Sequence, residues 1–91
     1  MKVEQYIALN QFHLYGEGKH YLQSYNSLVV KIQGKEVILG RDWDYSKTTS
    51  KYVYQFLDDY SDIRIYDIPN KRDYIRKLIE DGTIKYDENM V

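Results

Sequence analysis

The sequence predicts a single α+β domain over residues 1–91, in which an antiparallel sheet of three to five strands carries two helices packed on one face. Three observations favour this fold. Four of the five glycines fall in the first forty residues, where they separate short segments rich in β-forming residues. Two later segments repeat apolar residues at helical spacing, so each has one apolar face to bury. A chain of 91 residues has room for one hydrophobic core.

The region of about residues 5–40 is predicted to form a β-meander. Three or four antiparallel strands are expected there, from the segments 6–15, 19–25, 28–32 and 36–39. The first hairpin loop contains Gly16-Glu17-Gly18 and the second contains Gly34. Asn26 and Ser27 supply turn residues between the two hairpins.

The first helix is predicted over about residues 46–60. Its buried face follows the i, i+4, i+7, i+8, i+11 spacing: Thr49, Val53, Phe56, Leu57 and Tyr60. Asp44 and Ser46 are the two N-cap candidates.

The second helix is predicted over about residues 70–81, between the cap candidate Asn70 and a terminating glycine. Between the helices, residues 63–68 alternate and are rich in β-formers, which predicts a short strand ended by a proline. Residues 83–86 could add an edge strand, and residues 87–91 are expected to form a frayed C-terminal tail.

The composition excludes several classes of protein. The net charge is −1, with 13 Lys and Arg against 14 Asp and Glu, so no general attraction to polyanions is expected. The absence of cysteine excludes disulfides, thiolate catalysis, thiolate zinc sites and iron–sulfur clusters. No apolar run approaches the roughly 20 residues of a membrane span, and the N-terminus lacks the apolar region of a secretory signal. We therefore expect a cytoplasmic protein without membrane contact.

Catalytic motifs are absent, including Gly-rich phosphate loops, Gly-x-Ser-x-Gly elbows and His-Glu-x-x-His patterns. We therefore predict no enzyme activity and no cofactor. The two histidines, His13 and His20, flank the first hairpin loop. A three-residue loop would place them on opposite faces of the sheet, and a two-residue loop would place them on one face. A metal ion would still need carboxylates, and Glu17 is the only acid in that loop, so no metal site is predicted.

One candidate binding surface lies on the first helix, opposite its apolar face. Its residues, which we call the lysine–tyrosine stripe, are Lys47, Lys51, Tyr54 and Asp58. We expect this stripe to face outward and to bind a protein partner, with Tyr54 as the principal contact. The alternative is that Tyr54 lies flat against Lys47, Lys51 or a neighbouring element.

A second candidate surface lies on the second helix and would bind nucleic acid. Its basic residues are Lys71, Arg72, Arg76 and Lys77. Arg72 and Arg76 are neighbours at i, i+4 and could contact phosphates. The alternative is a solvated helix face balanced by nearby acids, and the near-neutral charge of the chain favours this alternative.

The most distinctive segment, residues 40–52, joins the only tryptophan to a hydroxyl-rich helix start. Trp43 is predicted to staple the helix against the sheet. The side chains that could cap the amides of the first turn are Asp44, Ser46, Thr48 and Thr49. The same amides could instead hold an anion, with Lys47 and Lys51 nearby. Capping is the preferred interpretation.

This segment resembles a group of small proteins carried by bacteriophages and other mobile elements of Gram-positive bacteria. Their shared pattern is a Ser-Tyr before an apolar strand, then Trp-Asp-Tyr-Ser-x-Thr-Thr-x-Lys before an aromatic helix that ends in Phe-Leu. In this chain the matching residues are Ser24-Tyr25, 28–32, Trp43–Ser46, Thr48-Thr49, Lys51 and Phe56-Leu57.

The resemblance implies an accessory protein that acts by binding a host protein, including components of defence systems such as CRISPR nucleases. It assigns no functional residues. We therefore predict a non-enzymatic protein-binding accessory protein with an anti-CRISPR-like role. Nucleic-acid binding through the second helix is the alternative.

Overall fold

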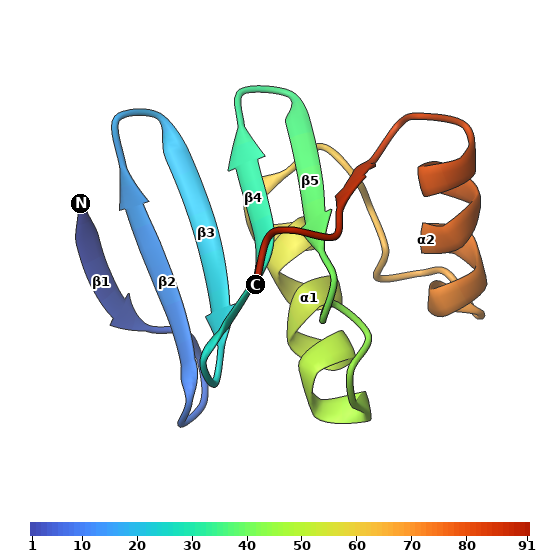
Figure 1. The fold of residues 1–91 in the computed structure, drawn as a ribbon. Helices are drawn as coiled ribbons and strands as arrows, with labels where there is room; N and C mark the ends of the chain where they lie inside the picture. Colours follow the sequence, from blue (N-terminus) through green and yellow to red (C-terminus); the bar gives the residue numbers. More distant parts are fainter.

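The structure, a computed structural model that describes residues 1–91, contains one six-stranded sheet and two helices (Figure 1). The strands are β1 (Lys2–Gln5), β2 (Gln11–Gly16), β3 (Lys19–Ser24), β4 (Ser27–Gln33), β5 (Glu36–Gly40) and β6 (Lys85–Asp87). The helices are α1 (Lys47–Tyr60) and α2 (Lys71–Glu80). Strands β1 to β5 pair antiparallel in chain order, and β6 pairs parallel to β5. This confirms the predicted α+β class, with one strand more than expected.

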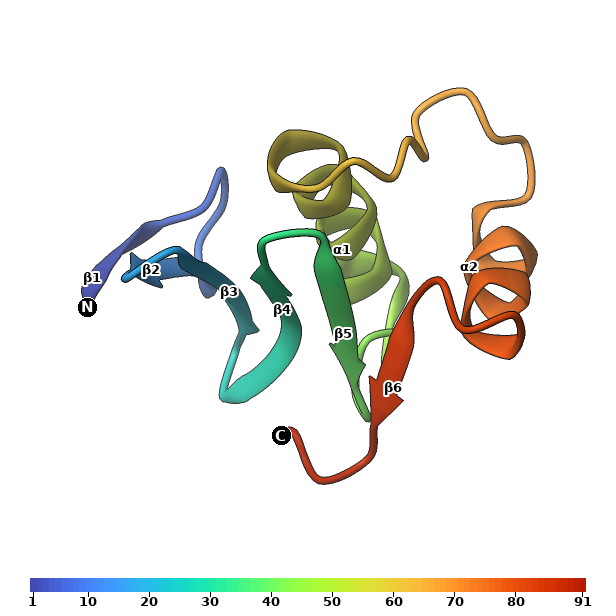
Figure 2. The ribbon, with the colours of Figure 1, turned by 90° about the horizontal axis from the view of Figure 1, so that it is seen from above.

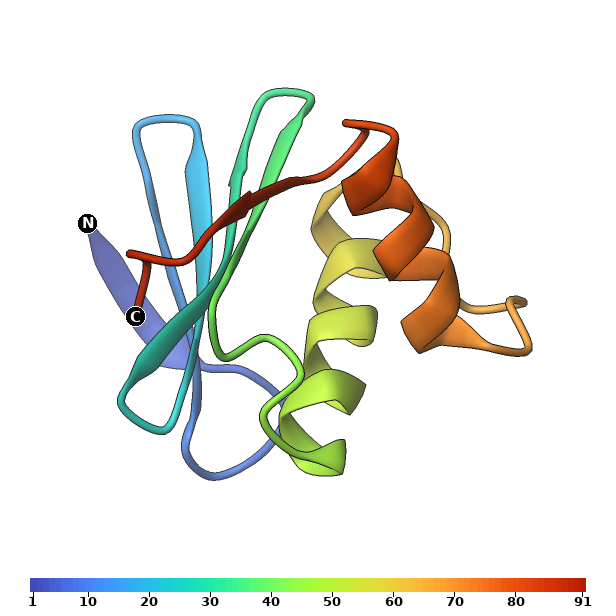
Figure 3. The same cartoon turned by 45° about the vertical axis from the view of Figure 1, so that its right-hand side comes forward.

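Both helices lie on the same side of the sheet (Figure 3). Helix α1 packs against β3 and β4, and the sheet curves around it, while α2 lies beyond it near β6 (Figure 2). The core between these layers contains fourteen buried residues: Tyr6, Leu22, Val29, Val30, Ile32, Val37, Leu39, Trp43, Val53, Phe56, Leu57, Ile65, Ile75 and Ile84. Both helices match the predicted ranges to within a residue because their periodic apolar faces are buried in this core.

The first hairpin turns through two residues, Glu17 and Gly18. Gly16 pairs with Lys19, and the two loop residues have φ values of 53° and 75°. Positive φ at both positions is typical of the type I′ turn, which matches the twist of antiparallel strands. Of the two loop lengths considered from the sequence, the two-residue loop, which places His13 and His20 on one face of the sheet, is therefore correct.

The prediction of one long strand over residues 6–15 is wrong. The chain instead forms β1 and β2 with a loop between them, because Tyr6 turns into the core rather than continuing the ladder. Its hydroxyl donates a hydrogen bond to Asp59 Oδ2 at 2.6 Å. Ile7 and Asn10 adopt positive φ and reverse the chain direction within this loop.

The prediction of a strand over residues 63–68 is also wrong, since this segment is an irregular connection between the helices. Ile65 is buried, but its amide donates to the carboxylate of Asp58 at 2.7 Å rather than to a neighbouring strand. The amide of Ile68 then closes a turn onto the Ile65 carbonyl. The alternating pattern therefore places Ile63 and Ile65 against the core without forming a ladder.

The C-terminal residues are docked rather than frayed, which corrects the predicted tail over 87–91. Strand β6 extends the sheet, and Ile84 just before it is fully buried. The carbonyl of Met90 accepts a hydrogen bond from the amide of Arg41. A side chain at Gly40 would place its Cβ 2.5 Å from the carbonyl oxygens of both Leu28 and Met90. The tail therefore crosses the end of β5 at a position that has room only for glycine.

Candidate functional site

A cleft of about 600 Å³ separates α1 from the connection to α2, and we call it the helix cleft. All four residues of the lysine–tyrosine stripe line it. The other lining residues are Asp44, Tyr45, Ser46, Ser50, Gln55, Tyr66, Lys71 and Arg72. The cleft thus brings together the predicted partner-binding stripe and two members of the predicted nucleic-acid cluster.

The stripe is not uniformly exposed, which corrects the expectation of an entirely outward face. Lys47 and Lys51 are exposed, whereas Tyr54 and Asp58 are half-buried. Tyr54 packs against the core, and this burial raises the pKa of its phenol. Asp58 has a structural role because its carboxylate accepts the amide hydrogen of Ile65.

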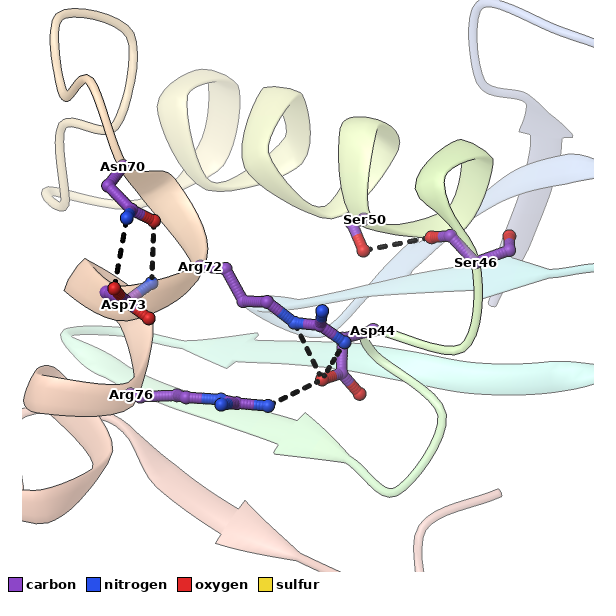
Figure 4. A network of polar contacts seen from close by, with 7 residues as sticks. All are labelled: Asp44, Ser46, Ser50, Asn70, Arg72, Asp73 and Arg76. Carbon is purple, nitrogen blue, oxygen red and sulfur yellow. Dashed lines mark hydrogen bonds and ion pairs between the residues drawn. The ribbon is translucent and has the colours of Figure 1, made fainter.

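The two arginines of α2 are held by one carboxylate. Asp44 Oδ2 lies 3.0 Å from Arg72 Nη2 and 3.7 Å from Arg76 Nη2 (Figure 4). Asp44 therefore ties the loop before α1 to α2, and Ser46 alone supplies the N-cap by accepting the amide of Thr49. Sequence spacing could not reveal this contact, since the residues are 28 and 32 positions apart in the chain.

The remaining basic residues of α2 differ in their surroundings. Lys71 donates its ammonium group to the Ile68 carbonyl at 3.0 Å, whereas Lys77 is exposed. The predicted nucleic-acid cluster is therefore partly engaged within the protein. It does not form a continuous basic surface.

Two exposed tyrosines that line the helix cleft were not predicted as partner-binding residues. Tyr45 and Tyr66 are each 80% exposed, more than any other large hydrophobic residue of the chain. Tyr66 was considered only as an aromatic that could stack on a base beside the basic residues of α2. The available signal was position: Tyr45 lies between the cap candidates, and Tyr66 alternates with the inward-facing Ile63 and Ile65.

A second cleft, of about 580 Å³, adjoins the first at Tyr45 and Ser46; we call it the hydroxyl cleft. It lies between the β3–β4 turn and the start of α1, and seven of its ten lining residues are polar. Ser24 and Thr49 share a buried hydrogen bond of 3.1 Å, and Ser27 donates to Asp42 at 2.9 Å. The Ser-Tyr and the Tyr-Ser-x-Thr-Thr parts of the sequence motif therefore meet in one place.

Apolar loop residues lie at the same end of the molecule as the start of α1 (Figure 1). Ile7 and Leu9 in the β1–β2 loop are 61% and 76% exposed, and Tyr25 in the β3–β4 turn is 51% exposed. The two loops are joined by a hydrogen bond from the Tyr25 amide to the Asn10 carbonyl. Ile7 and Tyr25 both adopt positive φ, which is uncommon for a residue other than glycine.

The histidines form a pair beneath the C-terminal end of α1. His13 Nε2 lies 2.8 Å from His20 Nδ1, and Tyr60 packs against both rings. Burial lowers the pKa of His13, although Glu4, whose carboxylate lies 3.4 Å from His13 Nδ1, opposes this effect. The fold gathers no group of three or more His, Asp or Glu side chains that could hold a metal ion.

These features define a small α+β domain with a tyrosine-bearing double cleft at the start of α1. The chain belongs to a family of unknown function, DUF8033, whose profile it matches over residues 1–76. That range includes both histidines, the whole of the hydroxyl cleft and all the residues that line the helix cleft. No curated protein and no solved structure matches the chain. Neither helix is long and apolar enough to cross a membrane.

Proposed function

We propose that this protein is a non-enzymatic accessory protein of a phage or mobile element that acts in the host cytoplasm by binding a host protein. Components of host defence complexes, including CRISPR nucleases, are the first candidate partners. The observation that carries the proposal is the exposure of Tyr45 and Tyr66 at the helix cleft. Tyrosine is enriched among the residues that dominate binding energy at protein interfaces.

The surroundings of these tyrosines support a protein interface. Exposed apolar side chains near a polar cleft are typical of a binding surface, in which an apolar centre is bordered by polar groups. Tyr25, Ile7 and Leu9 lie at the same end of the molecule as Tyr45, so a single partner could contact all of them. The ion pairs of Asp44 hold the two walls of the helix cleft together, which reduces the entropy lost on binding.

Nucleic-acid binding is the second candidate function. Tyr66 lies in the same cleft as Lys71 and Arg72, an arrangement that could stack a base beside a phosphate. The ion pairs of Arg72 and Arg76 with Asp44 and the net charge of −1 weaken this candidate, because both reduce the attraction for a polyanion. We therefore favour a protein partner.

The experiment is affinity capture from a Gram-positive host lysate followed by mass spectrometry. The wild-type protein is compared with the Tyr45→Ala/Tyr66→Ala variant and with the control Tyr86→Ala, which removes an exposed tyrosine from β6. We expect one host protein to be enriched by the wild type and by Tyr86→Ala and to be lost with the double variant.

A titration of the purified partner then measures the effect. Each cleft tyrosine should contribute about 2 kcal/mol or more to binding, while thermal stability should change by less than about 0.5 kcal/mol. Capture that is unaffected by the double substitution would contradict the proposed site.

A further inference from the structure

We propose that the helix cleft binds an acidic polypeptide segment, one in which aspartate or glutamate side chains face Lys47 and Lys51. This inference rests on the proposed function and names the chemistry of the partner. It is carried by the charges of the cleft, by the position of the lysines on α1, and by the exposed tyrosines.

The charged groups that line the cleft leave an excess of positive charge. Four cationic side chains line it against two carboxylates, those of Asp44 and Asp58. Both carboxylates are already engaged, Asp44 by the arginines of α2 and Asp58 by a backbone amide. The exposed acids of the connection, Asp62 and Asp67, do not line the cleft. An incoming carboxylate would therefore meet Lys47 and Lys51, which form no ion pair within the protein.

The lysines stand at the end of α1 where positive charge is least favourable. The helix dipole places partial positive charge at its N-terminus, so acidic side chains are preferred in the first turn. Helix α1 has no acidic residue in its first turn, and it begins with Lys47. Lys51 follows one turn later, at a spacing where like charges repel. A bound carboxylate would relieve both unfavourable interactions.

Tyr45 and Tyr66 supply the contacts that a peptide needs besides charge. Their rings are exposed and can pack on the apolar parts of a polypeptide, while each hydroxyl can donate a hydrogen bond to a carboxylate or a backbone carbonyl. The cleft volume of about 600 Å³ also lies within the usual range of binding pockets.

The distribution of charge favours a short acidic segment over a nucleic acid. Inside the cleft the cationic side chains outnumber the carboxylates, whereas the outer part of α2 and its end carry Asp73, Glu80 and Asp81. A long phosphate backbone would approach these acids, whereas a few carboxylates inside the cleft would not.

The test is an NMR titration of the isotope-labelled protein with three probes: hexaglutamate, hexaglutamine and a single-stranded thymidine hexanucleotide. Hexaglutamine matches the first probe in length and shape but lacks charge. We expect hexaglutamate to shift the amide signals of Lys47, Lys51 and Tyr66, and to bind at least about tenfold more tightly than hexaglutamine. Added salt should weaken this binding, because the cleft is open to screening by ions.

Charge-reversal variants show whether the cleft is responsible. Lys47→Glu/Lys51→Glu should abolish the preference for hexaglutamate. The matched control Lys2→Glu/Lys35→Glu changes the net charge equally, at exposed residues of β1 and of the β4–β5 turn, and should retain the preference. Equal binding of the two peptides, tighter binding of the hexanucleotide, or an equal loss in both charge variants would overturn the inference.

The two proposals fail in different ways. If the captured partner depends on Tyr45 and Tyr66 but is still bound by Lys47→Glu/Lys51→Glu, the acidic segment is wrong while the protein-binding function stands. If the partner does not depend on the tyrosines, the proposed function itself is wrong at this site.

Discussion

Trp43 and Tyr45, two residues of the sequence motif, have different roles in the structure. The side chain of Trp43 is only 4% exposed and belongs to the core, although it lies in the loop just before α1. Two positions later, Tyr45 is 80% exposed. One short loop therefore supplies both an anchor for the fold and a side chain free to contact another molecule.

We expect Trp43→Ala to lower the free energy of unfolding by about 3–5 kcal/mol, because a large buried side chain would be replaced by a cavity. Urea unfolding monitored by circular dichroism measures this change. Tyr45→Ala is the control and should stay within about 0.5 kcal/mol of the wild type. An unchanged unfolding midpoint for Trp43→Ala would mean that the ring does not anchor α1.

The His13–His20 pair predicts a dependence of stability on pH. Burial lowers the pKa of His13 in the folded protein below its ordinary value of 6.5, while Glu4 opposes this and the neighbouring His20 adds to it. Below pH 6.5 the unfolded chain therefore binds more protons than the folded chain at this residue, so stability falls as the pH is lowered through this range. Urea unfolding at a series of pH values should show this loss, and His13→Gln, which cannot titrate, should reduce the slope. An identical slope in His13→Gln would assign the pH dependence to other groups.

The elements illustrate which parts of the fold could be predicted from the sequence. The helices and the β2–β5 meander were predictable because their signals are local: periodic apolar faces, cap residues and glycine turns. The edge strand expected over 83–86 corresponds to β6, but its parallel pairing with β5 and the contact of Asp44 with α2 depend on residues far apart in the chain, and no local pattern reports them. The prediction of a strand over residues 63–68 was wrong because alternation describes equally well a strand and a loop that packs alternate residues, here Ile63 and Ile65, on the core.

In the candidate site, too, local spacing was informative and contacts between distant residues were not predictable. The spacing of the lysine–tyrosine stripe correctly placed four residues on one side of α1. Spacing could not show that Tyr54 is half-buried near Asp44 and the arginines of α2. The exposure of Tyr45 and Tyr66 at one cleft likewise depends on tertiary structure, because the two residues are 21 positions apart in the chain.

The close contact between β5 and the C-terminal segment at Gly40 leads to a prediction about stability. Gly40→Ala should destabilise the protein by about 1–3 kcal/mol, as overpacking of a closely packed site does. The reason is that the new Cβ would lie 2.5 Å from two backbone carbonyl oxygens, those of Leu28 and Met90, and backbone adjusts less readily than a side chain. Chemical denaturation measures the loss, and hydrogen exchange should show faster opening of β6. Wild-type stability in this variant would show that the tail does not dock across Gly40 in solution.

At the scale of the whole molecule, charge decides between the candidate partners. The chain has a net charge of −1, and only six of its 13 lysines and arginines lie on the two helices, which also carry Asp58, Asp59, Asp73 and Glu80. Such a molecule has little long-range attraction for polyanions. The cations that line the helix cleft can still act at short range on a ligand that enters it.

We therefore expect no measurable binding to duplex or single-stranded DNA at physiological salt. Fluorescence anisotropy with labelled oligonucleotides tests this. Submicromolar binding that weakens steeply with salt, and that Arg72→Ala/Arg76→Ala reduces, would instead support the nucleic-acid function, because salt sensitivity reports phosphate contacts.

The left-handed backbone at Ile7 implies a compromise between stability and activity. A β-branched residue at φ 65° is strained, and 61% exposure means that burial returns little of this cost. Ile7→Asn, a residue that tolerates this conformation, should therefore stabilise the protein by about 0.5–2 kcal/mol, which a raised melting temperature would reveal. If the exposed loop contacts the partner, the same substitution should weaken capture. A more heat-resistant protein would then be a poorer binder, and selection for robustness alone would remove the side chain that the interaction needs.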